Sequence, residues 1–235
     1  MSGKSLRLGI KKFPMVMDSL HNFFSDLIYE SGLARESVFI KAHPLSREEA
    51  IGHPKEGNYP LLRGKERLME ATFKGAKGQA HADLWGDYEG ALLDVLNLPF
   101  SDDFQRAVMV STLNVVLTYL GRIKGAVYCK DEAPGRCAEE LKGYIHSHYG
   151  RPKIALIGLR PRMAEGLAGS FPLRIVDLDP ENMGKGFGKV KVEGPWAEDE
   201  ALRECDLAVV TGTVLVNGTI EQILPYSHKV LFYGF

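Results

Sequence analysis

The stretch RPKIALIGLRPRMAEGLAGSFPLRIVDLD, residues 151–179, decides the fold. It holds two apolar runs, Ile154–Gly158 and Leu173–Leu178, and the segment between them has Pro161 at a position suited to the first turn of a helix. Apolar strands that alternate with short helices are typical of parallel β-α units, whose central strands are covered on both faces. The stretch therefore predicts the beginning of a parallel α/β domain.

The same alternation continues beyond this stretch. Three further apolar runs follow, at Val190–Val192, Leu207–Thr211 and Val230–Tyr233. We expect a Rossmann-like α/β domain over residues 151–235, with the boundary at Arg151. Residues 1–150 are expected to form an α+β domain of a different kind.

The first part of the chain has mixed periodicity. Helical patterns cover Met15–Ser31, Leu84–Leu96, Asp102–Leu120 with Ser101 as N-cap, and Cys137–Tyr149; strand candidates are Ser37–Ala42 and Gly125–Cys129, and a brief helix is expected at Ser46–Glu49. Frequent Gly and Pro between Ile51 and Asp83 indicate a loop-rich region with short strands.

The composition excludes several classes of function. Apolar residues make up 45% of the chain and the net charge is −1, so no global positive field favours nucleic acid. The most apolar stretch, Val108–Leu120, is too short to cross a membrane, and no export signal is evident. Three cysteines do not make a disulfide framework. We expect a cytoplasmic protein with free thiols.

The most site-like segment follows the run that ends at Thr211. Thr211-Gly212-Thr213 and then Asn217 offer hydroxyl and amide groups with close access to the backbone. Ligands of open α/β sheets sit beyond the carboxyl ends of the strands, so these residues are candidate ligand contacts. The alternative is an ordinary strand-to-helix turn capped by Asn217 or Thr219.

Two other strand ends carry charged candidates. Arg160 follows Gly158 at a helix N-terminus that could hold an anion, although an arginine at this position breaks the dinucleotide pattern G-x-G-x-x-G. Asp177 and Asp179 lie at the end of the second run, where an acid of nucleotide-binding domains meets ribose hydroxyls. An aspartate there is also a common turn residue.

The first domain offers weaker candidates. Lys74 and Gln79 lie near a glycine pair. His81 and Asp83 are two residues apart, a spacing that suits either two metal ligands or a general base with the carboxylate that orients it. Cys129 and Asp131 could bind a soft divalent or heavy-metal ion, while a buried structural cysteine is the alternative. We assign Lys74 and Gln79 to a ligand, and His81, Cys129 and Asp131 to a metal.

Several segments, in order, resemble the putative heavy-metal chelation family of bacteria and archaea. They are Glu70–Gly75, Gly78–Ala80, Leu113–Val116, Cys129–Glu132, Asp177–Asn182, Thr211–Thr213, Asn217–Ile220 and Phe232–Gly234. The resemblance implies an enolase N-terminal-like domain followed by a Rossmann-like domain, with the site in the cleft between them.

Three hypotheses follow. The leading one is a protein that binds a small polar ligand, or a metal with its chelator, between the domains. The second is a transferase-type enzyme that uses an adenosyl cofactor such as S-adenosylmethionine, because an acid follows the second run without a dinucleotide fingerprint. The third is a scaffold for contacts in a homo-oligomer or with a partner.

Overall fold

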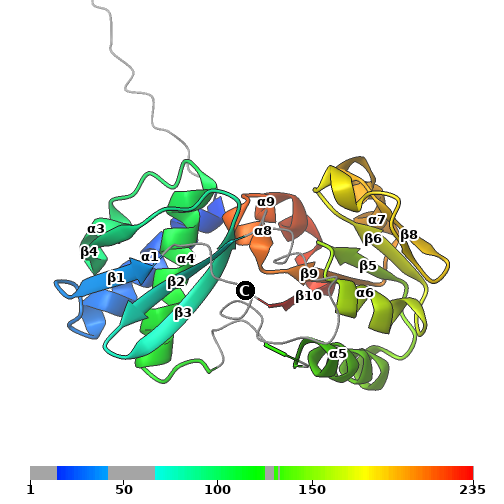
Figure 1. Cartoon of the computed structure of the whole chain (residues 1–235), viewed down its shortest axis with the longest axis horizontal. Helices are drawn as coiled ribbons and strands as arrows, with labels where there is room; N and C mark the ends of the chain where they lie inside the picture. The colour runs from blue at the N-terminus through cyan, green and yellow to red at the C-terminus, as the bar shows by residue number, and fades with distance from the viewer. Residues whose placement is uncertain (1–14, 42–66, 125–129, 132, 235) are drawn as a thin grey trace, which may run out of the picture.

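The fold contains two sheets that lie side by side (Figure 1). The computed structural model describes residues 15–41, 67–124, 130–131 and 133–234. The first part contains α1 (Met15–Glu30), β1 (Ser37–Lys41), β2 (Arg67–Phe73), β3 (Ala76–Ala82), β4 (Tyr88–Ala91), α3 (Leu92–Leu96) and α4 (Asp103–Tyr119). The expected strand at 125–129 and the brief helix at 46–49 lie outside the described residues.

The first sheet is antiparallel, with strand order β3-β2-β1-β4. Its two longest strands, β2 and β3, form a hairpin whose turn is Lys74-Gly75, with φ of 47° and 83°. This hairpin corrects the expectation of a loop-rich region up to Asp83. Glycine in β3 obscured the strand in the sequence, because it serves close packing there.

That close packing is between β3 and α4. A Cβ on Gly78 would lie 2.2 Å from the backbone nitrogen of Val115 and 2.6 Å from the carbonyl oxygen of Ser111. Only glycine therefore lets the helix backbone approach the strand at this point. The apolar core of this part forms around α4 and includes Phe24, Met69 and Met109.

Two helix starts differ from the expected ones. The N-cap of α4 is Asp102, whose Oδ1 accepts a hydrogen bond of 2.9 Å from the backbone nitrogen of Gln105, and Ser101 precedes it. Both residues are good N-caps, so the sequence did not separate them. Of the helix expected at 84–96, only α3 is helical. Residues Tyr88–Ala91 before it form β4, which pairs with β1.

The second sheet contains the runs that the sequence singled out. Its strands are β5 (Ile154–Ile157), β6 (Leu173–Val176), β7 (Gly186–Phe187), β8 (Val190–Glu193), β9 (Leu207–Thr211) and β10 (Val230–Tyr233). The order is β10-β9-β5-β6-β8-β7, and only β7 is antiparallel to its neighbour. In chain order, the five parallel strands are arranged 3-2-1-4-5, as in Rossmann domains. The fold is therefore mixed α/β with a Rossmann-like C-terminal sheet, as predicted.

Helices cover both faces of this sheet. They are α5 (Ala133–Tyr149), α6 (Pro161–Ala168), α7 (Glu198–Glu204), α8 (Thr213–Val216) and α9 (Ile220–Ile223), with 3₁₀ turns η2 (Pro180–Asn182), η3 (Pro195–Ala197) and η4 (Leu224–Lys229). One apolar cluster combines Ile145 of α5 and Leu167 of α6 with Leu156. The opposite face buries Ala155 and Ile157 against Ala201 of α7. Alternate residues of β5 therefore face opposite layers.

Helix α5 packs with the second sheet although it precedes Arg151. Its Ile145 is fully buried in the cluster that covers β5 and α6. The predicted boundary at Arg151 stays a prediction, and this packing leads us to propose a boundary before α5. Cys137, expected to open a helix, instead lies inside α5, because the helix begins at Ala133.

The short helix α8 joins the two parts. Val216 is buried in the core around α4, whereas Val214 is buried in the cluster that contains β9. A second link is the hydrogen bond of 2.8 Å from the Val16 backbone nitrogen of α1 to Oε1 of Glu221 in α9. The two parts of the chain thus meet through α8 and α9 (Figure 1).

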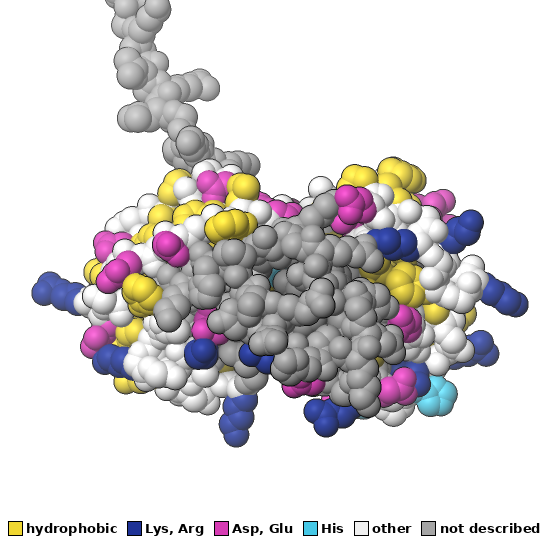
Figure 2. All heavy atoms as spheres, in the orientation of Figure 1, with side chains coloured by type: hydrophobic (Ala, Val, Ile, Leu, Met, Phe, Trp, Pro, Cys, Tyr) yellow, Lys and Arg dark blue, Asp and Glu magenta, His cyan; other side chains and the backbone are white. Residues whose placement is uncertain are grey.

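The surface in Figure 2 shows Lys and Arg side chains spread around the outline of the face in view rather than gathered in one patch. None of the helices in the described part of the chain has the length and apolar content that crossing a bilayer requires.

Candidate functional site

A pocket of about 460 Å³ lies at the carboxyl ends of β5, β6 and β9. Residues at the end of β3 and the start of α4 form its opposite wall. Its lining comprises His81, Ala82, Asp83, Asp103, Ile157, Gly158, Val176, Asp177, Leu178, Asp179, Pro180, Glu198, Thr211, Thr213, Val214, Val216, Asn217 and Thr219. The volume is within the range of about 300–1,000 Å³ that is usual for small-molecule sites.

The pocket lies at the point where the strand order reverses, between β5 and β9. Gly158 there has a φ of 86°, and a Cβ on it would lie 2.3 Å from Cγ2 of Thr211. A side chain at this position would therefore be strained and would collide with the end of β9. The glycine lets the backbone after β5 turn close beside Thr211.

Asp177 fixes the shape of this edge. Its Oδ2 accepts a hydrogen bond of 2.6 Å from the backbone nitrogen of Leu159. Its Oδ1 accepts from the backbone nitrogen of Asp179 and from Nδ2 of Asn182, both at 2.9 Å. Because both oxygens already hold the chain, Asp177 serves mainly to position the turns after β5 and β6.

The end of β9 presents hydroxyl groups. Oγ1 of Thr213 donates to Oγ1 of Thr211 at 3.3 Å, and the backbone nitrogen of Gly212 donates to the carbonyl of Tyr233 at 3.0 Å. Oδ1 of Asn217 accepts from both the backbone nitrogen and Oγ1 of Thr219, at 3.1 and 2.9 Å. Asn217 therefore shapes the turn into α9, and its amide nitrogen has no acceptor among the residues that the structure describes.

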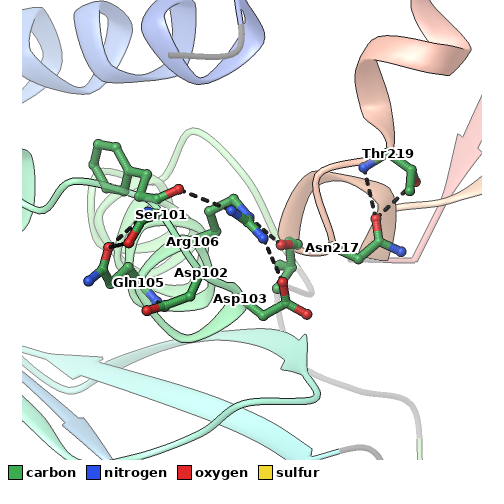
Figure 3. Close-up of polar contacts among 9 residues, drawn as sticks. Ser101, Asp102, Asp103, Gln105, Arg106, Asn217 and Thr219 are labelled. Atoms are coloured by element: carbon green, nitrogen blue, oxygen red, sulfur yellow. Dashed lines mark hydrogen bonds and ion pairs between the residues drawn. The ribbon is translucent and has the colours of Figure 1, made fainter. Parts of the chain in front are cut away.

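Arg106 of α4 connects the opposite wall to α8 (Figure 3). Its Nε donates to the carbonyl of Val216 at 2.5 Å, and its Nη1 donates to the carbonyl of Phe100 at 3.0 Å. Its Nη2 forms an ion pair of 2.5 Å with Asp103, which lines the pocket. One guanidinium thus ties a pocket carboxylate of α4 to the end of α8.

Glu198, the first residue of α7, is the most unusual group in the wall. Its side chain is buried, with 7% of the residue exposed, and it has no hydrogen bond or ion pair with any described residue. Burial raises the pKa of its carboxyl above the ordinary value. A buried carboxylate without a partner is costly, and this cost falls when a ligand supplies a donor.

The structure brings five of the predicted site residues together. Thr211, Thr213, Asn217, Asp179 and His81 all line the pocket. His81 reaches it from β3 and is itself only 4% exposed. Contact of these residues with a ligand stays a prediction.

Other predicted residues lie elsewhere. Lys74 is in the β2–β3 turn, and its Nζ forms an ion pair of 2.9 Å with Oε1 of Glu36. The turn is about 17 Å from His81, measured along β3. Nε2 of Gln79 donates a hydrogen bond of 2.7 Å to Oε2 of Glu70. Arg160 is the N-cap of α6 and Asp131 is an exposed residue with a φ of 55°, and neither lines the pocket.

The predicted metal ligands do not form a site in the described residues. Cys129 lies outside these residues, and Asp131 is not beside His81 in the pocket wall. Across residues 15–41, 67–124, 130–131 and 133–234, no three His, Cys, Asp or Glu side chains gather closely enough to hold a metal ion. The residues that the structure describes therefore do not fit a bare metal ion, which needs about four or more ligands.

Two pocket carboxylates escaped the sequence analysis. Glu198 follows the strand Val190–Glu193, and reading that strand end as the others were read would have found it. Asp103 gave no such signal, because it comes from α4 and reaches the pocket only through tertiary packing.

Comparisons with known proteins agree with the resemblance. Residues 145–233 match the DUF364 family, described as putative heavy-metal chelation. A DUF364 protein of unknown function from Pyrococcus horikoshii has the same fold at 15% identity and a TM-score of 0.54, with 91% of this chain and 76% of that chain covered. One from Desulfitobacterium hafniense has 12% identity and a TM-score of 0.52, with 92% and 78% covered. None of the curated proteins matches this chain significantly.

Proposed function

We propose that this protein, whose residues 145–233 match the model of the putative heavy-metal chelation family, binds a small polar ligand in the pocket between β3 and the second sheet. A metal would enter as a complex with an organic chelator, because the described side chains supply no group of three ligands. The observation that carries the proposal is the convergence of three parallel strand ends with His81 and Asp103 around one cavity.

The location supports the proposal in two ways. Ligands of doubly wound sheets bind where the strand order reverses, and the pocket lies at that point, between β5 and β9. Its wall also combines apolar residues such as Ile157 and Val214 with a few polar groups, which is the usual composition of a ligand site.

A pocket-filling substitution tests the proposal. The probes are S-adenosylmethionine, a set of polar metabolites, and Zn²⁺, Ni²⁺, Co²⁺ and Cu²⁺, each alone and as a citrate or histidine complex. At 100 times its dissociation constant, a ligand should add about 2.7 kcal/mol to the free energy of unfolding, measured by thermal shift. We expect Thr213→Trp to abolish that shift, since Thr213 lines the pocket.

The control is Lys74→Met, because Lys74 lies in the distant β2–β3 turn. Its shift should equal that of the unaltered protein. A shift that persists in Thr213→Trp would place binding elsewhere. If bare ions raise the melting temperature as much as their complexes do, the proposal that a metal enters with an organic chelator is wrong.

A second candidate function is that of a transferase-type enzyme with an adenosyl cofactor. It is favoured by the strand order 3-2-1-4-5 together with Asp179 in the pocket after β6. S-adenosylmethionine alone, among the probes, should then shift the protein, and the shift should fall in Asp179→Asn. A panel in which S-adenosylmethionine has no effect would exclude this candidate.

A further inference from the structure

The pocket wall is strongly acidic. Its described lining contains five carboxylates and neither Lys nor Arg; the carboxylates belong to Asp83, Asp103, Asp177, Asp179 and Glu198. A negative wall repels phosphate and carboxylate groups and attracts positive charge. The charge of the described wall thus favours cationic ligands over anionic ones.

Three of these five carboxylates are already stabilised by contacts within the protein. Asp103 is paired with Arg106, and Asp177 accepts three hydrogen bonds from the protein. Asp179 accepts from the backbone nitrogen of Glu181 at 3.0 Å. These groups shape the wall and are stabilised in the free protein.

Glu198 differs from them in a way that points to a ligand. It is more than nine-tenths buried, it lines the cavity, and the described residues give its carboxylate no donor and no counter-ion. Neighbouring acids of the same helix show the ordinary arrangement, since Glu200 and Glu204 are exposed and pair with Arg174. A positively charged group of a ligand in the pocket would supply the counter-ion that the described residues do not give Glu198.

We propose that the ligand carries a positively charged nitrogen, an ammonium or guanidinium group, and that Glu198 is the carboxylate that binds it. This inference rests on the proposed function and adds the class of the ligand. A nitrogen cation suits the site better than a metal ion does, because a single carboxylate can bind an N–H group, and the hydroxyl groups elsewhere in the pocket wall offer further acceptors. Metal ions require several ligands together, which the described residues do not supply.

Matched probes test this class directly. We would titrate the full chain with benzylamine, benzylguanidine, benzyl alcohol and benzoate, and measure dissociation constants by isothermal titration calorimetry and ligand-observed NMR. The cations should bind about tenfold more tightly than benzyl alcohol, because a hydrogen bond to a charged group contributes about 1.5 kcal/mol. Benzoate should bind most weakly.

Variants assign the preference to one residue. Glu198→Gln keeps the shape and should abolish the preference for the cations, whereas Glu198→Asp keeps the charge and should retain part of it. Glu200→Gln is the matched control on the same helix, and it should leave the preference unchanged because Glu200 lies outside the pocket lining. Circular dichroism of each variant checks that it is folded.

The outcomes separate this inference from the proposed function. Equal binding of amine and alcohol, or a preference that survives Glu198→Gln, would overturn the inference. If alcohol or benzoate binds and Thr213→Trp abolishes that binding, the pocket is a ligand site and only the cation class is wrong. If no probe binds below about 10 mM, both proposals fail together.

Discussion

The two sheets deliver side chains to the pocket in different ways. In the second sheet, β5, β6 and β9 are parallel, so their carboxyl ends lie at one edge, and the residues that follow each strand meet there. In the first sheet the strands are antiparallel, and their ends alternate between opposite edges. His81 and Asp83 reach the pocket from one end of the hairpin, while Lys74 lies at the other.

This difference separates the roles of the two walls. The parallel sheet supplies most of the lining, and its turns are held by bonds within that sheet, such as those of Asp177. The antiparallel sheet supplies only the closing wall, and that wall is held in place by α4. Substitutions in the two parts should therefore have different consequences for stability and for binding.

The largest effect is expected where the antiparallel sheet meets α4. Gly78→Ala would place a methyl group 2.2 Å from backbone atoms that cannot move without the whole helix. We expect a loss of about 4 kcal/mol in the free energy of unfolding, measured by urea denaturation. The position of His81 should change with it, because both residues are on β3.

The control for this substitution is Gly143→Ala in α5. A Cβ there would meet nothing within 4 Å. Since alanine favours helices over glycine, this variant should be more stable by up to about 1 kcal/mol. A Gly78→Ala protein as stable as the unaltered chain would show that β3 and α4 are less closely packed than described.

A smaller loss is expected at the joint between the walls. Arg106→Met would leave the Val216 and Phe100 carbonyls and the Asp103 carboxylate without their donor. We expect denaturation to show a loss of about 2–3 kcal/mol. Arg122→Met, at an exposed site just after α4, should change stability by less than about 0.5 kcal/mol. Equal effects of the two variants would mean that Arg106 does not hold the walls together.

The smallest effect is a gain, and it concerns the parallel wall. Burial raises the pKa of Glu198, so folding favours its protonated form. Its stabilising contribution is complete below the pKa of the unfolded chain and is lost as the pH rises through the folded pKa. Glu198→Gln should therefore match the unaltered protein near pH 4 and exceed it by about 1 kcal/mol near pH 7.

Urea denaturation across this pH range measures the difference. The rest of the pocket wall is the same in both proteins, so the difference between them reports on position 198 alone. A difference that does not depend on pH would show that the carboxylate is already compensated in the free protein.

The second sheet was predictable because its pattern is local. Each of its parallel strands appears as an apolar run, and the rule for strand ends led to Thr211, Thr213, Asn217 and Asp179. The first sheet was less predictable because its long strands contain glycine, whose purpose is contact with a helix distant in sequence. No local pattern could show that Asp103 lies opposite β9, since only the packing of α8 against α4 brings them together.

Helix α8 has a thermodynamic consequence. Val216 of this helix is buried in the apolar cluster around α4, Val214 is buried in the cluster that contains β9, and Thr213 lines the pocket. Neither cluster can melt without exposing part of α8, so heating should produce a single cooperative calorimetric transition rather than two. An occupied pocket would then raise the melting temperature of the whole chain, including helices that never touch the ligand.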